Sequence, residues 1–289
     1  MDNEKTETKV KKKSKKVLWI VLGSILAAAA LAALIIFLII PSIRYSQAKT
    51  AIENGNYIEA YNTLVELDGF RDSQKLIDSI YNKYLVQYLN GAEVGDTFFF
   101  GSYEQDNNTG NGGEDIEWII LDKQEGKVLA LSKYALDCVA YNSEFASSSW
   151  ETCTIRPWLN ETFMNTAFQA KDQEMILTTT VTADTNPLFD TDPGNDTQDK
   201  IFLLSISEAE KYGTDRTLLQ CAPTKYAIKR RIELYEDTGN CRWWLRSPGL
   251  NPSDASAVGG HGYIFNQGNY VFFRFYGARP AMWIDISQK

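Results

Sequence analysis

A long uncharged stretch close to the start of the chain constrains the fold more than any other feature of the sequence. Residues 17–40 read VLWIVLGSILAAAALAALIIFLII and hold no charged side chain over 24 positions. At about 1.5 Å of rise per residue, a helix of that length exceeds the ~30 Å hydrocarbon core of a bilayer. The stretch therefore predicts a transmembrane helix over residues 17–40.

The charges beside this stretch predict its orientation. Residues 1–16 carry seven lysines against three acidic residues, a net charge of +4, whereas only Arg44 and Lys49 follow closely on the other side. Because cytoplasmic flanks are enriched in Lys and Arg, residues 1–16 are predicted to be a basic cytoplasmic tail. The protein is then a single-pass membrane protein with an extracytoplasmic C-terminal part. A cleaved signal peptide is the alternative, although its apolar region usually has about 7–15 residues.

Charge and composition exclude several function classes. The 289 residues have a net charge of −8, so the part beyond the basic tail carries −12. Nucleic-acid binding relies on a positive surface, so nucleic acid is excluded as a partner. A single His in the whole chain argues against a His-based triad or a His-rich zinc site. No P-loop, HExxH, nucleophile-elbow or kinase signature is present, and no organic cofactor is expected.

Residues 41–91 change to a helical pattern. Ala60–Tyr61 and Leu64–Val65 recur four residues apart, while Gly55–Asn56 and Asp68–Gly69 are typical of helix ends. The segment resembles the tetratricopeptide-like hairpins of bacterial surface proteins, in which a Gly turn and an aromatic precede E-A-x-x-x-L. About one and a half repeats are covered, fewer than the ~3 of an independent solenoid. The resemblance implies a stalk, which serves either as a spacer or as a protein-docking scaffold.

Residues 92–289 are predicted to form an α+β domain. A helix is expected over residues 154–168, and Ser205 with Glu208 fits a capping box that opens another helix. The C-terminal part contains short runs separated by glycines, among them CRWWLRSPG, ASAV, GYIF, YVFF and GARPAMWI, which are typical of short strands. Apolar runs predict further strands at residues 97–100, 117–121, 128–132 and 201–204.

Several phrases of this domain resemble an uncharacterised family of extracytoplasmic domains from low-GC Gram-positive bacteria. They are GSYEQDN, IEWIILD, LALSKYALDC, WETCTIRPWLN, FLLSISEAEKY, RWWLRSPG and GARPAMWI, and they span roughly residues 94–286. The family carries no settled activity. A Trp-rich strand followed by short polar strands, G-x-R-P and a last strand is also similar to C-type-lectin-like domains. This second resemblance implies a C-type-lectin-like fold for residues 92–289.

The segment that begins with the Trp-rich strand is the predicted ligand-binding site. Since neighbours in a strand face opposite sides, one of Trp243 and Trp244 is expected in a groove or at the surface. Aromatic faces beside polar groups suit sugar rings and other flat polar ligands. The predicted site residues are Trp243, Trp244, Arg246, Asp254, His261, Asn266, Tyr270, Arg274 and Tyr276.

These residues predict that the domain binds an extracellular glycan or protein without catalysis. Two alternatives stay open. One is an enzyme that acts on the cell envelope, because sequence alone does not place carboxylate pairs in space. The other is that the tryptophans are core residues and that Arg246 and Arg279 are buried partners of carboxylates.

Four cysteines and two acidic loops complete the candidate sites. Pairing neighbours gives Cys138–Cys153 and Cys221–Cys241 as disulfide candidates, while the other pairings and buried free thiols stay open. Clustered Asp and Asn suit Ca²⁺, so residues 106–115 and 190–199 are candidate loops, with solvated loops as the alternative. The calcium candidates of the second loop are Asp190, Asp192, Asn195 and Asp196.

Overall fold

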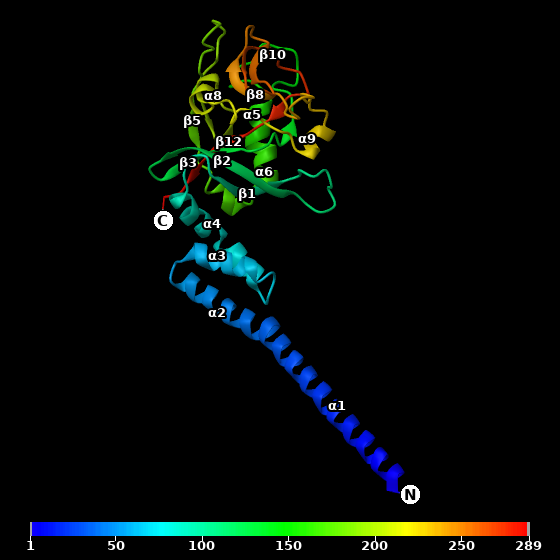
Figure 1. The fold of residues 1–289 in the computed structure, drawn as a ribbon. Coiled ribbons are helices and arrows are strands. Elements are labelled where there is room, and N and C mark those ends of the chain that lie inside the picture. Colours follow the sequence, from blue (N-terminus) through cyan, green and yellow to red (C-terminus); the bar gives the residue numbers. More distant parts are fainter. Residues whose placement is uncertain (1, 288–289) are drawn as a thin grey trace. The chain divides into compact units, whose positions relative to one another are not determined.

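The structure, a computed structural model, describes residues 2–287, and the side chains of residues 17–287. Its Cα atoms cluster into two compact units that meet between Tyr88 and Leu89. In the first unit, helix α1 (Asp2–Leu34), one π-helical segment η1 (Ile35–Ile39) and helix α2 (Ile40–Glu53) follow one another without a break (Figure 1).

The helical stretch Val17–Glu53 is long and apolar enough to cross a membrane, and none of its most apolar part is buried within the structure. A helix is therefore present where the sequence predicts one. Its length and composition are compatible with a single-pass anchor and equally with a signal helix.

Three helices pack around a small apolar core in the rest of the first unit. They are α2, α3 (Tyr57–Glu66) and α4 (Ser73–Gly91). Gly55, at φ 75°, reverses the chain after α2, a backbone conformation that glycine adopts without a Cβ clash. The core consists of Tyr45, Ala48, Ala51, Ala60, Leu64, Leu67 and Ile80.

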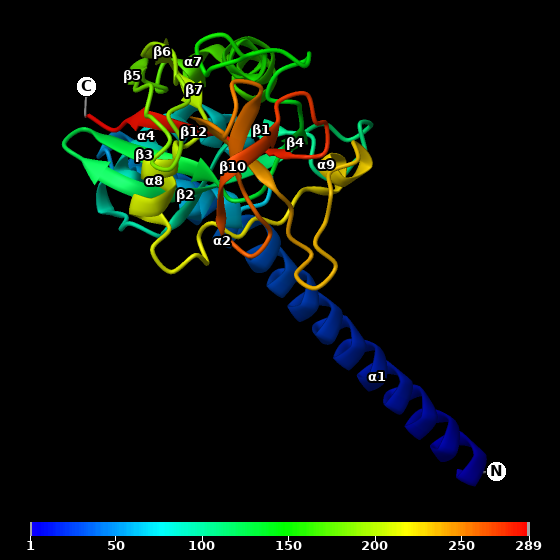
Figure 2. The same ribbon diagram turned by 90° about the horizontal axis from the view of Figure 1, so that it is seen from above.

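The second unit contains a first sheet of five strands in the order β1-β2-β3-β12-β7, all neighbours antiparallel. Strands β1, β2 and β3 form the meander predicted from the apolar runs. Strand β12, close to the C-terminus, lies between β3 and β7, so the end of the chain occupies the interior of the sheet (Figures 1 and 2). The bounds are β1 Thr97–Tyr103, β2 Glu114–Gln124, β3 Lys127–Ser132, β7 Ile201–Phe202 and β12 Ala281–Asp285.

A second sheet of five strands has the order β10-β9-β8-β11-β4. Strand β11 pairs in parallel with β8 and antiparallel with β4. Every residue of β8 is buried, so both faces of this strand are covered. The bounds are β4 Asp137–Cys138, β8 Trp243–Pro248, β9 Asp254–Val258, β10 Ile264–Tyr270 and β11 Gly277–Ala278, and a separate two-stranded sheet joins β5 (Thr179–Val181) to β6 (Thr197–Asp199).

Short helices connect the strands. The predicted helix over residues 154–168 is present as α5 (Ile155–Pro157), η2 (Trp158–Phe163) and α6 (Met164–Ala167). The predicted capping box is confirmed at the start of α8 (Ile206–Tyr212): the Glu208 N–H donates to Ser205 Oγ over 3.1 Å, and the Ser205 N–H donates to Glu208 Oε2 over 2.9 Å. The other helices are α7 (Ala170–Gln173) and α9 (Lys225–Lys229). The described chain is therefore a mixed helix and sheet structure behind an apolar N-terminal helix.

Candidate functional site

The expectation that one indole of the tryptophan pair lies in a groove or at the surface is wrong. Trp243 and Trp244 are both fully buried. Their side chains do face opposite sides of β8, but both sides are covered, and each indole N–H donates to a backbone carbonyl, Leu219 O at 2.9 Å and Val139 O at 3.0 Å. With its polar group satisfied, each tryptophan is a core residue.

Arg246 and Asp254 are also buried, which contradicts their prediction as ligand contacts. The Arg246 guanidinium forms an ion pair with Glu208 and donates to Leu203 O at 2.9 Å and Thr182 O at 3.2 Å. The Asp254 carboxylate accepts from the side chain of Asn251 at 2.8 Å. The alternative interpretation of Arg246 as a buried partner of a carboxylate is thus confirmed.

The remaining predicted residues lie in different surroundings. Tyr276 is buried and stacks on Trp244 with ring centroids 4.2 Å apart. His261 is exposed and lies 3.4 Å from a carboxylate oxygen of Asp237. Asn266 is partly buried, and its backbone carbonyl accepts from the side chain of Asn186 at 2.7 Å. The nine predicted residues therefore do not form one surface site.

Two of the nine, Tyr270 and Arg274, belong to a surface that the sequence had not delimited. Strand β10 ends at Tyr270, and residues 271–276 form a loop instead of the strand expected from YVFF. A register shift in β10 contains Gly268, at φ 69°, where a Cβ would lie 2.2 Å from Ala255 O. Residue 268 must therefore be glycine, and the bulge it permits sets the direction in which the loop leaves the sheet.

This loop carries most of a cluster of neighbouring aromatic rings, called here the aromatic patch. Phe145, from the loop between β4 and α5, is 62% exposed and packs edge-on against Tyr270 and Phe272 at centroid distances of 5.2 and 5.4 Å. The contacts continue inward through Phe273, 5.0 Å from Phe272, to Phe275, and from there to the buried Tyr276. The aromatic patch consists of Phe145, Tyr270, Phe272, Phe273 and Phe275.

The outer rings of the aromatic patch are exposed, and the patch packs on buried rings below it. Tyr276 and Trp244 stack beneath it, and the Asn269 side-chain amide donates to Tyr276 Oη at 3.0 Å. Burial raises the pKa of Tyr276, so its hydroxyl stays protonated at neutral pH. Two charged side chains, Arg274 and Glu144, are exposed within the loops that carry the rings. The surface thus joins apolar rings to hydrogen-bonding groups.

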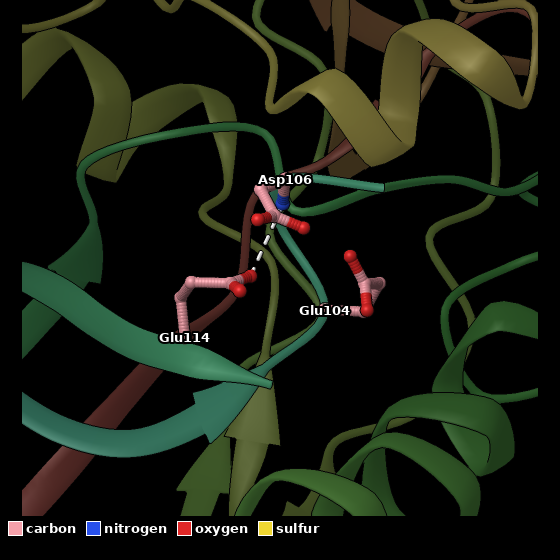
Figure 3. Close-up of side chains that lie close together, drawn as sticks. All are labelled: Glu104, Asp106 and Glu114. Carbon is pink, nitrogen blue, oxygen red and sulfur yellow. Dashed lines mark hydrogen bonds between the residues drawn. The ribbon is translucent and has the colours of Figure 1, made fainter. Parts of the chain in front are cut away.

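An acidic cluster lies between β1 and β2. The side chains of Glu104, Asp106 and Glu114 point toward one another, and one carboxylate oxygen from each lies within 4.8 Å of the others (Figure 3). Hard divalent cations such as Ca²⁺ take carboxylate ligands, although Ca²⁺ uses six to eight oxygens in all. The carboxylates also accept loop amides: Glu114 Oε2 from Gln105 N at 2.7 Å, and Asp106 Oδ1 from Asn108 N at 2.7 Å. Asp106 belongs to the first predicted calcium loop.

The calcium candidates of the second loop do not gather. Asp192 accepts the amide of Gly194 at 3.0 Å, and Asp196 accepts the amide of Ala183 at 2.8 Å. Asn195 donates to Glu151 instead of facing either residue. Within residues 17–287, Asp190, Asp192 and Asp196 form no such cluster of carboxylates. Asn195 and Asp196 therefore hold the loop to its neighbours, whereas the Asp192 hydrogen bond lies within the loop.

All four cysteines are buried free thiols in this structure. Cys138 donates to Arg274 O at 3.0 Å and Cys153 donates to Trp150 O at 3.2 Å. Burial raises the pKa of each of these two thiols to about 12. Cys221 and Cys241, by contrast, are direct neighbours, joined by a backbone hydrogen bond of 2.8 Å.

Sequence reasoning missed Phe145, Phe272, Phe273 and Phe275 as site residues. The dense aromatic run from residue 270 to 276 is a usable signal, because so many rings cannot all enter one core. Phe145 offers no such signal, since only the folded chain brings it beside Tyr270.

Comparison with curated proteins gave no match, and comparison with solved structures gave none. Comparison with protein families gave an uncharacterised domain. The match covers a shorter range than residues 94–286, over which the sequence phrases resemble such a family. Residues 125–286, more than half of the chain, match the family described as Domain of unknown function (DUF6273), and the chain therefore belongs to that family.

Proposed function

We propose that this protein is a single-pass membrane protein whose C-terminal domain binds an extracellular glycan without catalysis, through the aromatic patch. Residues 1–16 then lie in the cytoplasm and the folded domain lies outside the membrane. The cluster of five rings, of which Phe145, Tyr270 and Phe272 are exposed, is the observation that carries the proposal. Contiguous exposed apolar surface of this kind is uncommon on monomeric domains and typical of binding sites.

The composition of the patch favours a glycan over an anionic polymer. Sugar rings bind to aromatic faces and form hydrogen bonds with flanking polar groups, and Arg274 and Glu144 supply such groups here. The chain beyond residue 16 carries a net charge of −12, which repels polyphosphates and nucleic acids. A neutral or weakly charged glycan meets both conditions.

We also propose that the domain has a C-type-lectin-like fold and that residues 41–91 form a tetratricopeptide-like stalk. The order of the Trp-rich β8, the short strands β9 to β11, the residues GARP and the final strand β12 supports the first assignment. The helical hairpin, with Gly55 at its turn and Ala60 and Leu64 in its core, supports the second. An experimental structure compared with both fold families tests these assignments.

The binding proposal is tested with the full chain reconstituted in lipid nanodiscs and insoluble peptidoglycan stripped of anionic polymers. We expect Phe145→Ala and Phe272→Ala each to weaken retention by roughly 5- to 150-fold, because an aromatic contact at the centre of a site is worth about 1–3 kcal/mol. Phe265→Ala is the matched control, because Phe265 is 52% exposed on β10 and makes no ring contact with the five described patch residues. Its retention should equal that of the wild type.

Three outcomes would contradict the proposal. Equal retention of all three variants would remove the patch as the binding site. Capture of a protein through the same rings would replace the glycan with a protein ligand. Release of soluble fragments from the peptidoglycan would favour the alternative of an envelope-acting enzyme.

A further inference from the structure

Two of the four cysteines, Cys221 and Cys241, differ from the others because they are direct neighbours in the fold. Cys221 precedes and Cys241 follows the loop that carries α9, and the Cys241 N–H donates to Cys221 O at 2.8 Å. A backbone bond between two residues keeps their α-carbons within the roughly 4.4–6.8 Å that a disulfide spans. The Cys241 sulfur also lies 3.4 Å from Cys221 O, so the side chain is turned toward its partner.

The electrostatics of the pair are asymmetric. Burial opposes ionisation of Cys221, yet a hydrogen bond from the Cys241 thiol and the nearby Arg279 charge lower the pKa of Cys221 overall. The same hydrogen bond, together with burial, raises the pKa of Cys241. In the folded chain, Cys221 is therefore the more acidic of the two thiols.

Arg279 explains the asymmetry. Its guanidinium is 1% exposed, lies over the Trp243 ring at 4.9 Å, and donates to Ser132 O at 2.9 Å and Leu218 O at 2.8 Å. Within the described part of the chain, no carboxylate forms an ion pair with it. A buried cation without a carboxylate favours the ionised form of a nearby thiol, so the Arg279 charge lowers the pKa of Cys221.

We propose that Cys221 and Cys241 are joined as a disulfide in the exported protein, whereas Cys138 and Cys153 stay thiols. The oxidant is a disulfide-bonded thiol oxidoreductase outside the membrane. The Cys221 thiolate attacks one sulfur of the donor disulfide and releases one donor thiolate. The Cys241 thiolate then attacks the Cys221 sulfur of the mixed disulfide and releases the second donor thiolate, so the donor disulfide is reduced and the two thiol protons pass to the released thiolates.

Both sulfurs are buried in the finished fold, so the exchange takes place while the chain folds. The bond would close the base of the loop of residues 222–240. This loop carries Arg230, whose Nε lies 2.6 Å from a carboxylate oxygen of the buried Asp137. The disulfide would thereby hold α9 against β4. The inference rests on the extracytoplasmic placement in the proposed function, and it is independent of the aromatic patch.

The test maps thiols in the full chain taken from native membranes without reductant. Free thiols are blocked with N-ethylmaleimide in denaturant, and the digest is analysed by mass spectrometry before and after reduction. We expect a linked pair of peptides that contain Cys221 and Cys241, with Cys138 and Cys153 alkylated. Alkylation of all four, or a link that involves Cys138 or Cys153, would overturn the inference.

A stability measurement provides a second readout. Reductant should lower the midpoint of thermal unfolding of the wild type by roughly 5–10 °C, because the bond constrains the unfolded chain. The matched control Cys153→Ser should keep this effect of reductant, and Cys241→Ser should abolish it. If Cys241→Ser does not fold, the thiol map of the wild type alone decides. Ligand retention by the patch variants is read separately, so a failure there leaves the disulfide result unaffected.

Discussion

At the scale of single residues, neighbours decide the role of a side chain more than its type does. Arg246 and Arg274 both come from the segment predicted to bind a ligand, yet one is 3% exposed and the other lies at the surface. Arg246 is held by Glu208 and two backbone carbonyls. The two arginines therefore allow a matched comparison between a structural cation and a surface cation.

We expect Arg246→Ala to lower the free energy of unfolding of the domain by about 3–5 kcal/mol, because it leaves Glu208 without its buried partner. Arg274→Ala should change it by less than about 0.5 kcal/mol, as is usual for surface substitutions. Urea unfolding followed by tryptophan fluorescence measures both values. Similar costs for the two variants would show that Arg246 has no special structural role.

The buried Asp137 predicts a pH dependence of stability. It accepts from Tyr103 Oη at 2.7 Å and from Arg230 Nε at 2.6 Å, but burial outweighs these contacts and raises the pKa of its carboxyl above 3.8. An acid with a raised folded pKa contributes stability that is present below its unfolded pKa and is lost as pH rises through its folded pKa.

Asp137→Asn removes that titration. The stability of the variant relative to the wild type should therefore increase as pH rises from about 4 and level off once Asp137 is ionised. Urea unfolding between pH 4 and 8 measures this difference. A constant difference across the range would contradict the raised pKa.

At the scale of elements, the sequence predicted a helix or strand correctly where its local pattern of apolar or capping residues matches the packing around that segment. The meander of β1 to β3 follows its apolar runs, and the helix at α8 follows the Ser205–Glu208 capping box. The prediction of a strand at YVFF was wrong, because the bulge at Gly268 disturbs the strand pairing and the aromatic residues that follow lie in a loop. Phe145 and Tyr270 are far apart in the chain, so no local pattern indicates that they meet.

The Gly268 bulge yields a prediction of its own. Gly268→Ala should destabilise the domain by about 1–3 kcal/mol and weaken ligand retention, since the added Cβ meets Ala255 O and moves the loop that carries the patch. Gly91→Ala is the control, because nothing lies within 4 Å of its Cβ position. Thermal unfolding and the peptidoglycan assay measure both effects. Equal behaviour of the two variants would show that the bulge at Gly268 does not determine the position of the patch.

The packed helices of the first unit allow a similar comparison within helix α3. Leu64 is fully buried in the core of the first unit, whereas its neighbour Val65 is 49% exposed. We expect Leu64→Ala to destabilise the hairpin by about 2–5 kcal/mol and Val65→Ala to have a much smaller effect. Hydrogen exchange of residues 45–85 measures local opening. Unchanged exchange in Leu64→Ala would contradict the assigned core.

At the scale of the whole molecule, the distribution of charged and apolar residues predicts the orientation of the chain in the membrane. The apolar helix compatible with an anchor follows a tail of net charge +4, and the remainder of the chain is acidic. The chain is given an epitope tag at each end, and protease is added to intact cells from which the wall has been removed. The protease should remove the C-terminal tag and leave the N-terminal tag. The chain should also stay in the membrane fraction after carbonate extraction. Protection of the C-terminal epitope would reverse the predicted orientation.

The position of the last strands has a consequence for how the protein is made. Strand β11 lies between β8 and β4, and β12 lies between β3 and β7, so both five-stranded sheets receive an inner strand from residues 277–285. Until the ribosome has added these residues, each sheet lacks the strand that joins its parts and exposes unpaired edges. Both sheets are therefore complete only after residues 277–285 have been synthesised. A premature stop codon before residue 277 would leave neither sheet complete.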